Sequence, residues 1–128
     1  MIEIMQNVVR NRVLLVDDNP SIRRSLRLRF ERAGIEVAEA ENGRESIGMA
    51  QDYCPRVIIL DFRMPEMNGL EVAPHLKRLL PGSFIILFTM HSAEALETEA
   101  QRQGVTAVVS KDRAGIDLLS LAERLLAA

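Results

Sequence analysis

The sequence predicts an α/β protein with a doubly wound, five-stranded parallel sheet and helices on both faces. Short, apolar, β-branched runs alternate along the chain with longer segments of helical period, which is typical of this class. The runs that end at Val16, Leu60 and Phe88 are almost wholly apolar, as strands covered on both faces should be. The chain has 128 residues, of which 48% are hydrophobic, and this length and composition fit one globular domain.

The five predicted strands follow the apolar runs in chain order. The run at residues 36–40 mixes charged and apolar side chains, so we expect this strand at an edge of the sheet. The predicted strands comprise residues 12–16, 36–40, 57–60, 83–88 and 107–110.

Apolar residues at helical spacing predict one helix after each strand. The first starts after Asn19-Pro20 and stops at Gly34, because asparagine caps a helix start and glycine ends a helix. The fourth sets a thin apolar stripe against three glutamates, so we expect it to be loosely packed and mobile. The predicted helices comprise residues 20–33, 43–52, 69–80, 92–103 and 114–127.

Composition excludes several classes of function. A formal net charge of −2 gives no general attraction to nucleic acid or anionic lipid, and the longest apolar run, residues 84–88, is too short to cross a bilayer. The single cysteine, Cys54, cannot form an internal disulfide, so we expect a reducing, cytoplasmic location. We expect residues 1–11 to be a flexible lead-in rather than a secretory signal, and residues 12–128 to form the domain.

Polar residues follow four of the strands at the edge of the sheet where open α/β proteins bind ligands. Asp17 and Asp18 follow the first predicted strand, Asp61 the third, Thr89 the fourth and Lys111 the fifth. One polar strand end is common because loops are wet, but three acids, a hydroxyl and an ammonium together favour a charge-organised site.

Such an acid cluster needs a cation. Two carboxylates ~5 Å apart repel by roughly 3 kcal/mol at an effective dielectric of 20, so three of them take up protons or bind a metal ion. Mg²⁺ or Mn²⁺ suits a site made of carboxylates. We expect Asp18 and Asp61 to bind the metal ion directly and Asp17 to bind it through a water molecule.

Asp61 is the best candidate for a nucleophile, because it ends the central strand between the acid pair and Lys111. An aspartate beside a cation can attack a phosphoryl group and form an acyl phosphate. The metal ion and the Lys111 ammonium would stabilise the equatorial oxygens of the transferred group, and the Thr89 hydroxyl would bond one of them.

At these residues the chain resembles the receiver domain of bacterial two-component response regulators. The resemblance covers about residues 11–127, with matching motifs in the order and at the spacing of that family. They are Val13-Leu-Leu-Val-Asp-Asp-Asn-Pro20, Ile59-Leu-Asp-Phe-Arg-Met-Pro-Glu-Met-Asn-Gly69, Thr89 and Ser110-Lys111.

The resemblance implies a flavodoxin-like fold with strand order 2-1-3-4-5. It also implies that Asp61 accepts phosphate from the phosphohistidine of a sensor histidine kinase or phosphotransfer protein. Mg²⁺ would be held by Asp18, Asp61 and the backbone carbonyl of Arg63. The chain would then be a signalling switch that promotes its own phosphorylation and dephosphorylation, and not a metabolic enzyme.

In the family, the threonine and lysine sense the phosphate and shift the surface formed here by residues 92–103, 107–110 and 114–127. Receivers of this type often pair as homodimers through that surface. Ser110-Lys111-Asp112 resembles subfamilies in which a helix-turn-helix DNA-binding output domain follows the receiver, so DNA would be bound by that other domain.

Four positions set this chain apart or flank its site. Met90 stands where the family usually has a small residue, and a long side chain there would cover the site and slow phosphorylation. Val108 stands where the family commonly has Tyr or Phe, so the aromatic switch is missing. Arg63 and His91, each two residues beyond Asp61 or Thr89, are expected to modulate the rate of hydrolysis.

Three other classes of protein share part of the pattern. A magnesium-dependent phosphatase with an aspartyl nucleophile wants a second acid two residues later, where this chain has Arg63. A flavin or nucleotide binder wants a glycine- or hydroxyl-rich loop after the first strand, and the loop here is acidic. An interaction module that works without phosphate is supported only by Met90 and Val108.

The first predicted helix is rich in arginine, which favours a solvated basic face over a nucleic-acid site. The apolar residues of this helix resemble the place where a histidine kinase docks on a receiver, so the arginines would tune the choice of partner. They are Arg23, Arg24, Arg27, Arg29 and Arg32.

Overall fold

The computed structural model describes residues 8–90, 93–113 and 116–128. The strands are β1 (Val9–Val16), β2 (Glu36–Ala40), β3 (Pro55–Asp61), β4 (Phe84–Thr89) and β5 (Ala107–Ser110). The helices are α2 (Pro20–Arg32), α3 (Gly43–Tyr53), α4 (Gly69–Leu79), α5 (Ala93–Arg102), the short 3₁₀ helix η1 (Lys111–Arg113) and α6 (Ile116–Ala127).

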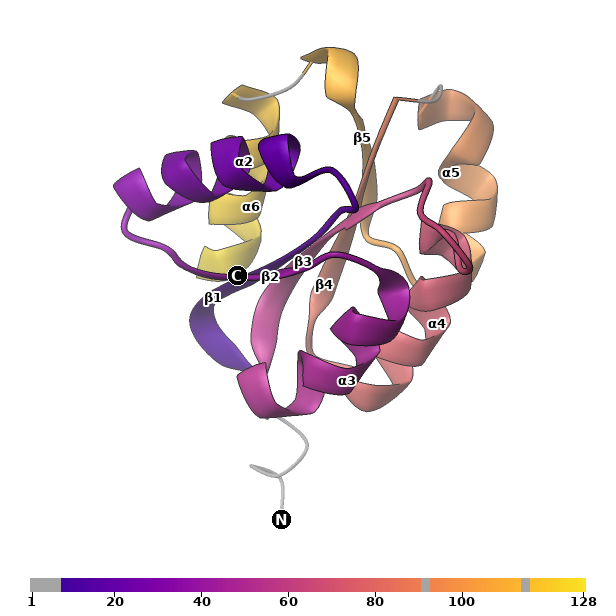
Figure 1. Ribbon diagram of the computed structural model, residues 1–128, viewed down its shortest axis with the longest axis horizontal. Helices are drawn as coiled ribbons and strands as arrows, with labels where there is room; N and C mark the ends of the chain where they lie inside the picture. The colour runs from indigo at the N-terminus through magenta and orange to yellow at the C-terminus, as the bar shows by residue number, and fades with distance from the viewer. Residues whose placement is uncertain (1–7, 91–92, 114–115) are drawn as a thin grey trace.

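The strands form one parallel sheet in the order β2-β1-β3-β4-β5, which confirms the predicted class, strand order and edge position of β2. Helices α2 and α6 cover one face of the sheet, and α3, α4 and α5 cover the other (Figure 1). Because all strands run the same way, their carboxyl ends meet at one edge. Among the described residues, no helix combines the length and the apolar character that crossing a membrane requires.

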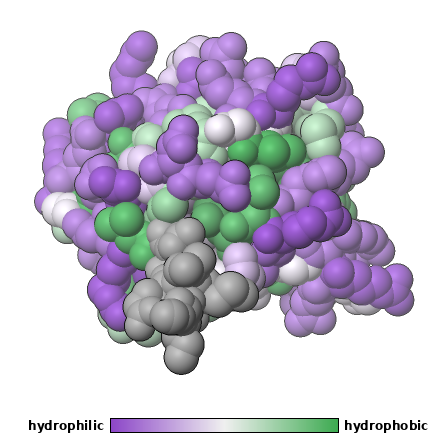
Figure 2. Space-filling view, turned by 90° about the horizontal axis from the view of Figure 1, so that it is seen from below, coloured by the Kyte–Doolittle hydropathy of each residue, from purple (hydrophilic) through white to green (hydrophobic). Residues whose placement is uncertain are grey.

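The first strand starts earlier than predicted. The Val9 N–H donates a hydrogen bond to the Cys54 carbonyl oxygen at 2.6 Å, and Val9 pairs with Pro55. Residues 9–11 therefore belong to the sheet, which corrects part of the predicted lead-in, while residues 1–7 lie outside the described residues. Figure 2 views this end of the molecule, where Val9 is 41% exposed and apolar side chains are visible among polar ones.

Alternate residues of the central strands enter two apolar layers, as the two-residue period of a strand requires. Leu14, Ile58 and Ile85 pack toward α3, α4 and α5. Leu15 and Ile59 pack toward α2 and α6. Full burial of each such side chain contributes about 1.5–3 kcal/mol. The carboxyl ends of β1, β3 and β4 therefore belong to strands that are packed by helices on both faces of the sheet.

Asparagine side chains cap the helices that leave this edge of the sheet. The Asn19 side chain accepts a hydrogen bond from the Ser21 N–H at 2.9 Å, and this bond opens α2 directly after the predicted acid pair. Asn68 and Glu71 form a reciprocal capping box at the start of α4. These caps fix the directions of the two loops that carry the candidate site.

Two further features concern Lys111, which follows β5, and helix α5. Lys111 directly follows β5, as predicted, and it also opens η1, so its side chain starts from a short helical turn. In α5, Ala100 is buried and Leu96 is partly buried against the core. The expected mobility of this helix stays a prediction.

Candidate functional site

The structure brings the predicted strand-end residues to one edge of the sheet. Asp17 directly follows β1, Asp61 and Thr89 are the last residues of β3 and β4, and Lys111 directly follows β5. The register keeps these ends level, because Val16 pairs with Leu60, Asp61 with Phe88 and Thr89 with Ser110. The Asp17 N–H donates to the Ala40 carbonyl at 3.1 Å and so continues the sheet by one residue.

The three acids form a cluster that suits a metal ion. Asp17, Asp18 and Asp61 each offer a carboxylate oxygen, and these oxygens lie within 4.8 Å of one another. Asp17 is 4% and Asp61 is 6% exposed, whereas Asp18 is exposed. Two buried carboxylates and one at the surface fit Mg²⁺, which prefers oxygen ligands and keeps several waters. The residues present therefore fit the cation that the sequence predicts.

Lys111 supplies the positive charge of the site. Its Nζ lies 3.1 Å from Asp17 Oδ2 and 3.2 Å from Asp61 Oδ1. The three side chains are no more than 10% exposed, so the contacts are desolvated on both sides. Removing Lys111 would leave the two buried carboxylates uncompensated, which is strongly destabilising.

The single ammonium does not fully compensate the acids. Burial raises the pKa of Asp61 to about 6, the charges of Asp17 and Asp18 raise it as well, and Lys111 opposes them. This raised pKa favours the protonated form of Asp61, and a carboxylic acid is a much weaker nucleophile than a carboxylate. A divalent cation would favour the ionised form.

Gly69 lets α4 start directly against the Asp61 backbone. The Gly69 N–H donates to the Phe62 carbonyl oxygen at 2.8 Å. A Cβ at this position would lie 2.5 Å from the Asp61 carbonyl oxygen and 2.7 Å from Leu87 Cδ1. Only glycine fits here without a shift of β3 or α4. The sequence places Gly69 at a helix start and in a family motif, but it does not predict this contact.

Arg23 contacts the backbone of the acid pair, and the prediction that it lies on a solvated basic face is wrong. Its side chain is 14% exposed and bonds both the Asp17 carbonyl and Glu39, so it is not on a solvated face. Arg27 also reaches Glu39 from the same side of α2. The basic face consists of the exposed residues Arg24, Arg29 and Arg32. The sequence does contain a signal for these ion pairs. Arg23 and Arg27 are four residues apart and so lie on the same side of a helix, and Glu39 is a charged residue within strand β2.

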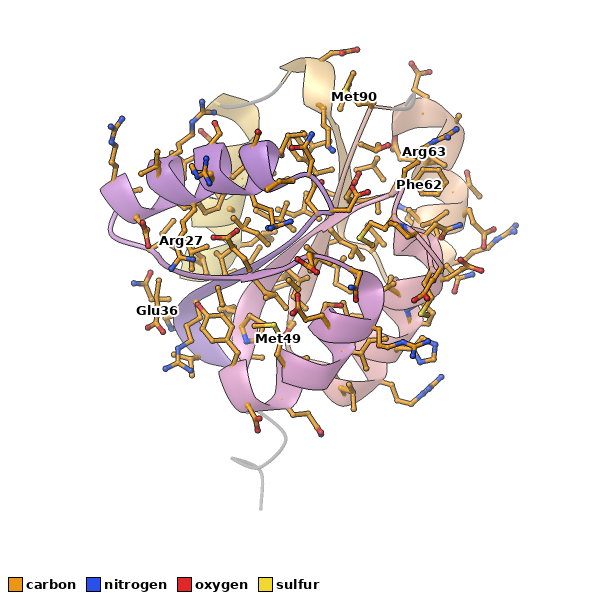
Figure 3. All side chains as sticks on the ribbon, viewed as in Figure 1. Arg27, Glu36, Met49, Phe62, Arg63 and Met90 are labelled. Carbon is orange, nitrogen blue, oxygen red and sulfur yellow. The ribbon has the colours of Figure 1, made fainter. Side chains whose placement is uncertain are left out.

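Of the residues predicted to modulate the site, the structure describes Met90 and Arg63. Met90 is 65% exposed, and Arg63 is exposed beside Asp18 (Figure 3). Val108 is half-buried on β5 and packs against the core on the α4 and α5 side. His91 lies outside the described residues.

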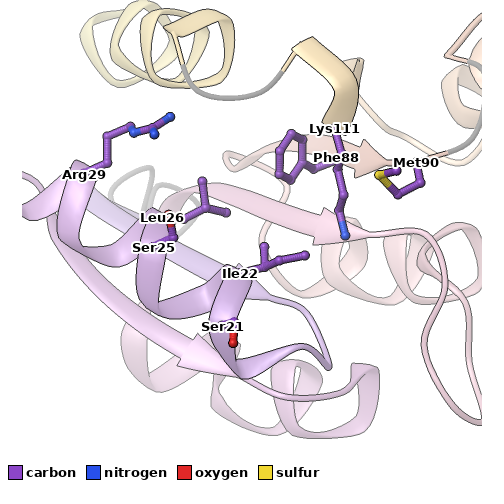
Figure 4. A pocket seen from close by; sticks show the side chains of 8 residues that line it. All are labelled: Ser21, Ile22, Ser25, Leu26, Arg29, Phe88, Met90 and Lys111. Carbon is purple, nitrogen blue, oxygen red and sulfur yellow. The ribbon is translucent and has the colours of Figure 1, made fainter.

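A pocket opens between α2 and the ends of β4 and β5. Figure 4 shows Phe88, Met90 and Lys111 side by side opposite residues of α2. Lys111 extends from η1 toward the carboxyl ends of the strands, so the pocket adjoins the acid cluster. The α2 residues that line it are Ser21, Ile22, Ser25, Leu26 and Arg29.

A doubly wound sheet with three clustered aspartates and a largely buried lysine side chain at its carboxyl edge defines a protein of the flavodoxin-like class with an acid pocket that could hold a metal ion. The chain belongs to the response regulator receiver domain family, whose family model matches residues 13–123.

Relatives and solved structures agree with this assignment. The chain is 35% identical over 101 residues to the chemotaxis protein CheY of Thermotoga maritima, covering 78% of this chain and 84% of that one. The structure of CheY4 from Vibrio cholerae superposes with a TM-score of 0.83 at 31% identity, over 89% of this chain and 97% of that one. The structure of TrrA from Thermotoga maritima in complex with Mg²⁺–BeF has a TM-score of 0.81 at 30% identity, over 90% and 98%.

Other relatives are longer proteins. A putative transcriptional regulator of Pseudomonas aeruginosa is 36% identical over 118 residues, which are 91% of this chain and 57% of that protein. The transcriptional activator ExaE of Pseudomonas putida is 34% identical over 90% of this chain and 55% of its own length. The chain thus spans little more than half the length of these curated relatives.

Proposed function

We propose that this chain is a phosphoacceptor switch in which Asp61 receives a phosphoryl group from the phosphohistidine of a sensor histidine kinase or phosphotransfer protein. The observation that carries the proposal is the convergence of Asp17, Asp18 and Lys111 on the Asp61 carboxylate at the carboxyl edge of the sheet. An Asp61 carboxylate oxygen attacks the phosphorus, the P–N bond of the phosphohistidine breaks, and the imidazole leaves with the electron pair. The product is an acyl phosphate on Asp61.

A magnesium ion would be held by Asp18, Asp61 and the backbone carbonyl of Arg63, with Asp17 bound through water. When bound, Mg²⁺ supplies charge that neutralises the carboxylates and the incoming phosphoryl oxygens. The carboxylate spacing in this chain supports this role, as does the Mg²⁺–BeF complex of the similar TrrA. Mn²⁺ would serve in the same place, because it accepts the same oxygen ligands.

Lys111 and Thr89 would read the phosphorylated state. The Lys111 ammonium already contacts Asp61 and would exchange part of that contact for the phosphoryl oxygens. Thr89, at the end of the neighbouring strand, would donate a hydrogen bond from its hydroxyl to a phosphoryl oxygen. The resulting shift would pass to the surface of α5, β5 and α6, with Val108 replacing the usual aromatic residue.

The partners follow from this cycle. The pocket beside Lys111 lies on α2, where we expect a kinase to dock, with Arg29 influencing which kinase is accepted. The longer relatives suggest that an output domain acts together with such a receiver. We expect the domain described here to contact that output domain or a second copy through α5, β5 and α6, and not to bind DNA itself.

The residue two positions after Asp61 distinguishes the proposed function from that of a phosphatase. A phosphatase with an aspartyl nucleophile needs a general acid to protonate its leaving group. The position two residues after Asp61 holds the exposed Arg63 and not a carboxylic acid. We therefore expect a single phosphorylation and a slow self-dephosphorylation, which Arg63, Met90 and His91 would tune.

The first prediction concerns stoichiometry and metal dependence. Incubation with Mg²⁺ and acetyl phosphate should add one phosphoryl group to the wild type, as measured by intact mass. The addition should disappear with a chelator and in Asp61→Asn, because the first lacks the cation and the second lacks the nucleophile. Asp52→Asn, which changes an exposed acid on α3, is the matched control and should behave as the wild type.

Two results contradict the proposal. An unchanged wild-type mass at saturating donor and Mg²⁺ would favour an interaction module that works without phosphate. Repeated turnover of many phosphate esters would favour a phosphatase.

A further inference from the structure

We propose that Arg23 is a positioning residue for phosphorylation: it clamps the backbone of the acid pair, and Glu39 of the edge strand holds Arg23 in place. This inference rests on the proposed function of Asp61 and assigns a role to two residues outside the acid pocket.

The clamp consists of two hydrogen bonds from one guanidinium. Arg23 Nη1 donates to the Asp17 carbonyl oxygen at 2.5 Å, and Arg23 Nε donates to Glu39 Oε1 at 2.9 Å. The Arg23 side chain is 14% exposed and that of Glu39 is 25% exposed. The rigid, planar guanidinium of Arg23 thus joins Asp17, the first residue of the acid pair, to strand β2, and most of its surface is removed from water.

The clamp completes the fixation of Asp17. The Asp17 N–H is held by the Ala40 carbonyl of β2. Its carboxylate accepts hydrogen bonds from the Asn19 N–H at 2.9 Å and from Lys111 Nζ at 3.1 Å. With the carbonyl bound to Arg23, every polar group of Asp17 has a partner. Loss of Arg23 would let the peptide between Asp17 and Asp18 rotate, and the two carboxylates would no longer share one orientation toward the metal ion.

The effect of Arg23 is geometric more than electrostatic, because its charge is matched by Glu39. Burial raises the pKa of Glu39, but hydrogen bonds from Arg27 and Arg23 outweigh burial and bring that pKa below its ordinary value. Glu39 is therefore ionised at neutral pH, and the Arg23–Glu39 pair adds little net charge to the acid pocket. What the pair contributes is a fixed direction for the Asp17 carbonyl.

Arg27 offers a matched comparison within the same cluster. Its Nη1 lies 2.8 Å from Glu39 Oε2, and its Nε lies 3.0 Å from Glu31 Oε2. Arg27 lies between α2 and the edge strand (Figure 3) and makes ion pairs of the same kind as Arg23. Among the described hydrogen bonds, Arg27 makes none to Asp17 or Asp18. If both arginines had a purely structural role, loss of either would lower stability and neither loss would change the Mg²⁺ requirement.

The test uses Arg23→Met, Arg27→Met and Arg23→Lys in the full chain. Thermal unfolding gives the structural cost of each change. The Mg²⁺ concentration for half-maximal phosphorylation by acetyl phosphate, and the rate at saturating Mg²⁺, give the functional cost.

Both methionine variants should lower the melting temperature. Only Arg23→Met should raise the Mg²⁺ requirement, by about tenfold or more, as loss of an outer partner of a metal ligand typically does. Arg23→Lys should recover part of that loss, because an ammonium can reach one acceptor at a time. If Arg23→Met does not fold, Arg23→Lys carries the test and must itself raise the Mg²⁺ requirement.

A wild-type Mg²⁺ requirement in Arg23→Met, or equal increases in both methionine variants, would overturn the positioning role. Failure of the proposed function is a separate result, because the wild type itself would then gain no phosphoryl group. In that case Mn²⁺ affinity measured by calorimetry would replace phosphorylation as the readout. Equal affinities of wild type and Arg23→Met would again refute the clamp.

Discussion

Asp61 lies in surroundings that disfavour its ionised form. Its carboxylate is removed from water, faces the charges of Asp17 and Asp18, and contacts the Lys111 ammonium. These contacts make the ionised side chain costly for the folded protein, and a bound cation would lower that cost. Under the proposed function, binding of Mg²⁺ would therefore favour the ionised form of Asp61, which is the form that attacks phosphorus.

The pH dependence of stability follows from this state. The pKa of Asp61 is about 6 in the folded protein, against an ordinary value of 3.8. The folded state thus binds the proton more tightly, and the stabilisation by that proton is complete below the ordinary pKa and lost as the pH rises through about 6. In a chelator, Asp61→Asn should exceed the wild type in free energy of unfolding by roughly 1–3 kcal/mol at about pH 7.5, and by much less at about pH 4.5.

Urea unfolding of both proteins at the two pH values measures this difference. Asp52→Asn serves as the control, because its exposed carboxyl should give no comparable change. An Asp61→Asn advantage of equal size at both pH values would show that the raised pKa is not its cause.

At the scale of the elements, the loops of the site are fixed by how α2 and α4 begin. Asparagine caps at Asn19 and Asn68 could be predicted from the sequence, as could the helices that they open. The close contact of Gly69 with the Asp61 carbonyl could not, because it depends on the distance between α4 and β3. The Arg23–Glu39 pair was missed for a similar reason: it depends on how α2 lies against β2.

Replacement of Gly69 tests the packing of α4 against β3. Gly69→Ala should destabilise the fold by about 1–3 kcal/mol and slow phosphorylation, because the added Cβ meets the Asp61 carbonyl oxygen at 2.5 Å and displaces the strand end. Gly48→Ala is the matched control, since a Cβ in that part of α3 meets nothing within 4 Å. The control should be neutral or more stable by up to about 1 kcal/mol, because alanine favours the helix.

Chemical unfolding gives the two free energies, and intact mass against time gives the phosphorylation rates. A Gly69→Ala protein as stable and as reactive as Gly48→Ala would mean that α4 can move away from β3 at no cost.

At the scale of the whole molecule, the parallel sheet acts as a rigid support that ends in a reactive edge. The apolar runs and helical periods predicted the class of fold, and the polar strand ends predicted Asp17, Asp18, Asp61 and Lys111 as one site. Strand order came only from the family resemblance, because several orders satisfy the same alternation of strands and helices. The start of β1 at Val9 was missed, since the polar residues Arg10 and Asn11 conceal a strand that is set by pairing with β3.

The phosphorylated position is the most direct test of the account as a whole. Borohydride reduces an aspartyl phosphate to homoserine, so peptide mass mapping after phosphorylation and reduction identifies the acceptor. The account predicts homoserine at position 61 and unchanged Asp17 and Asp18. Homoserine at either of those two acids, or a phosphoryl group that resists reduction and stays on another side chain, would contradict it.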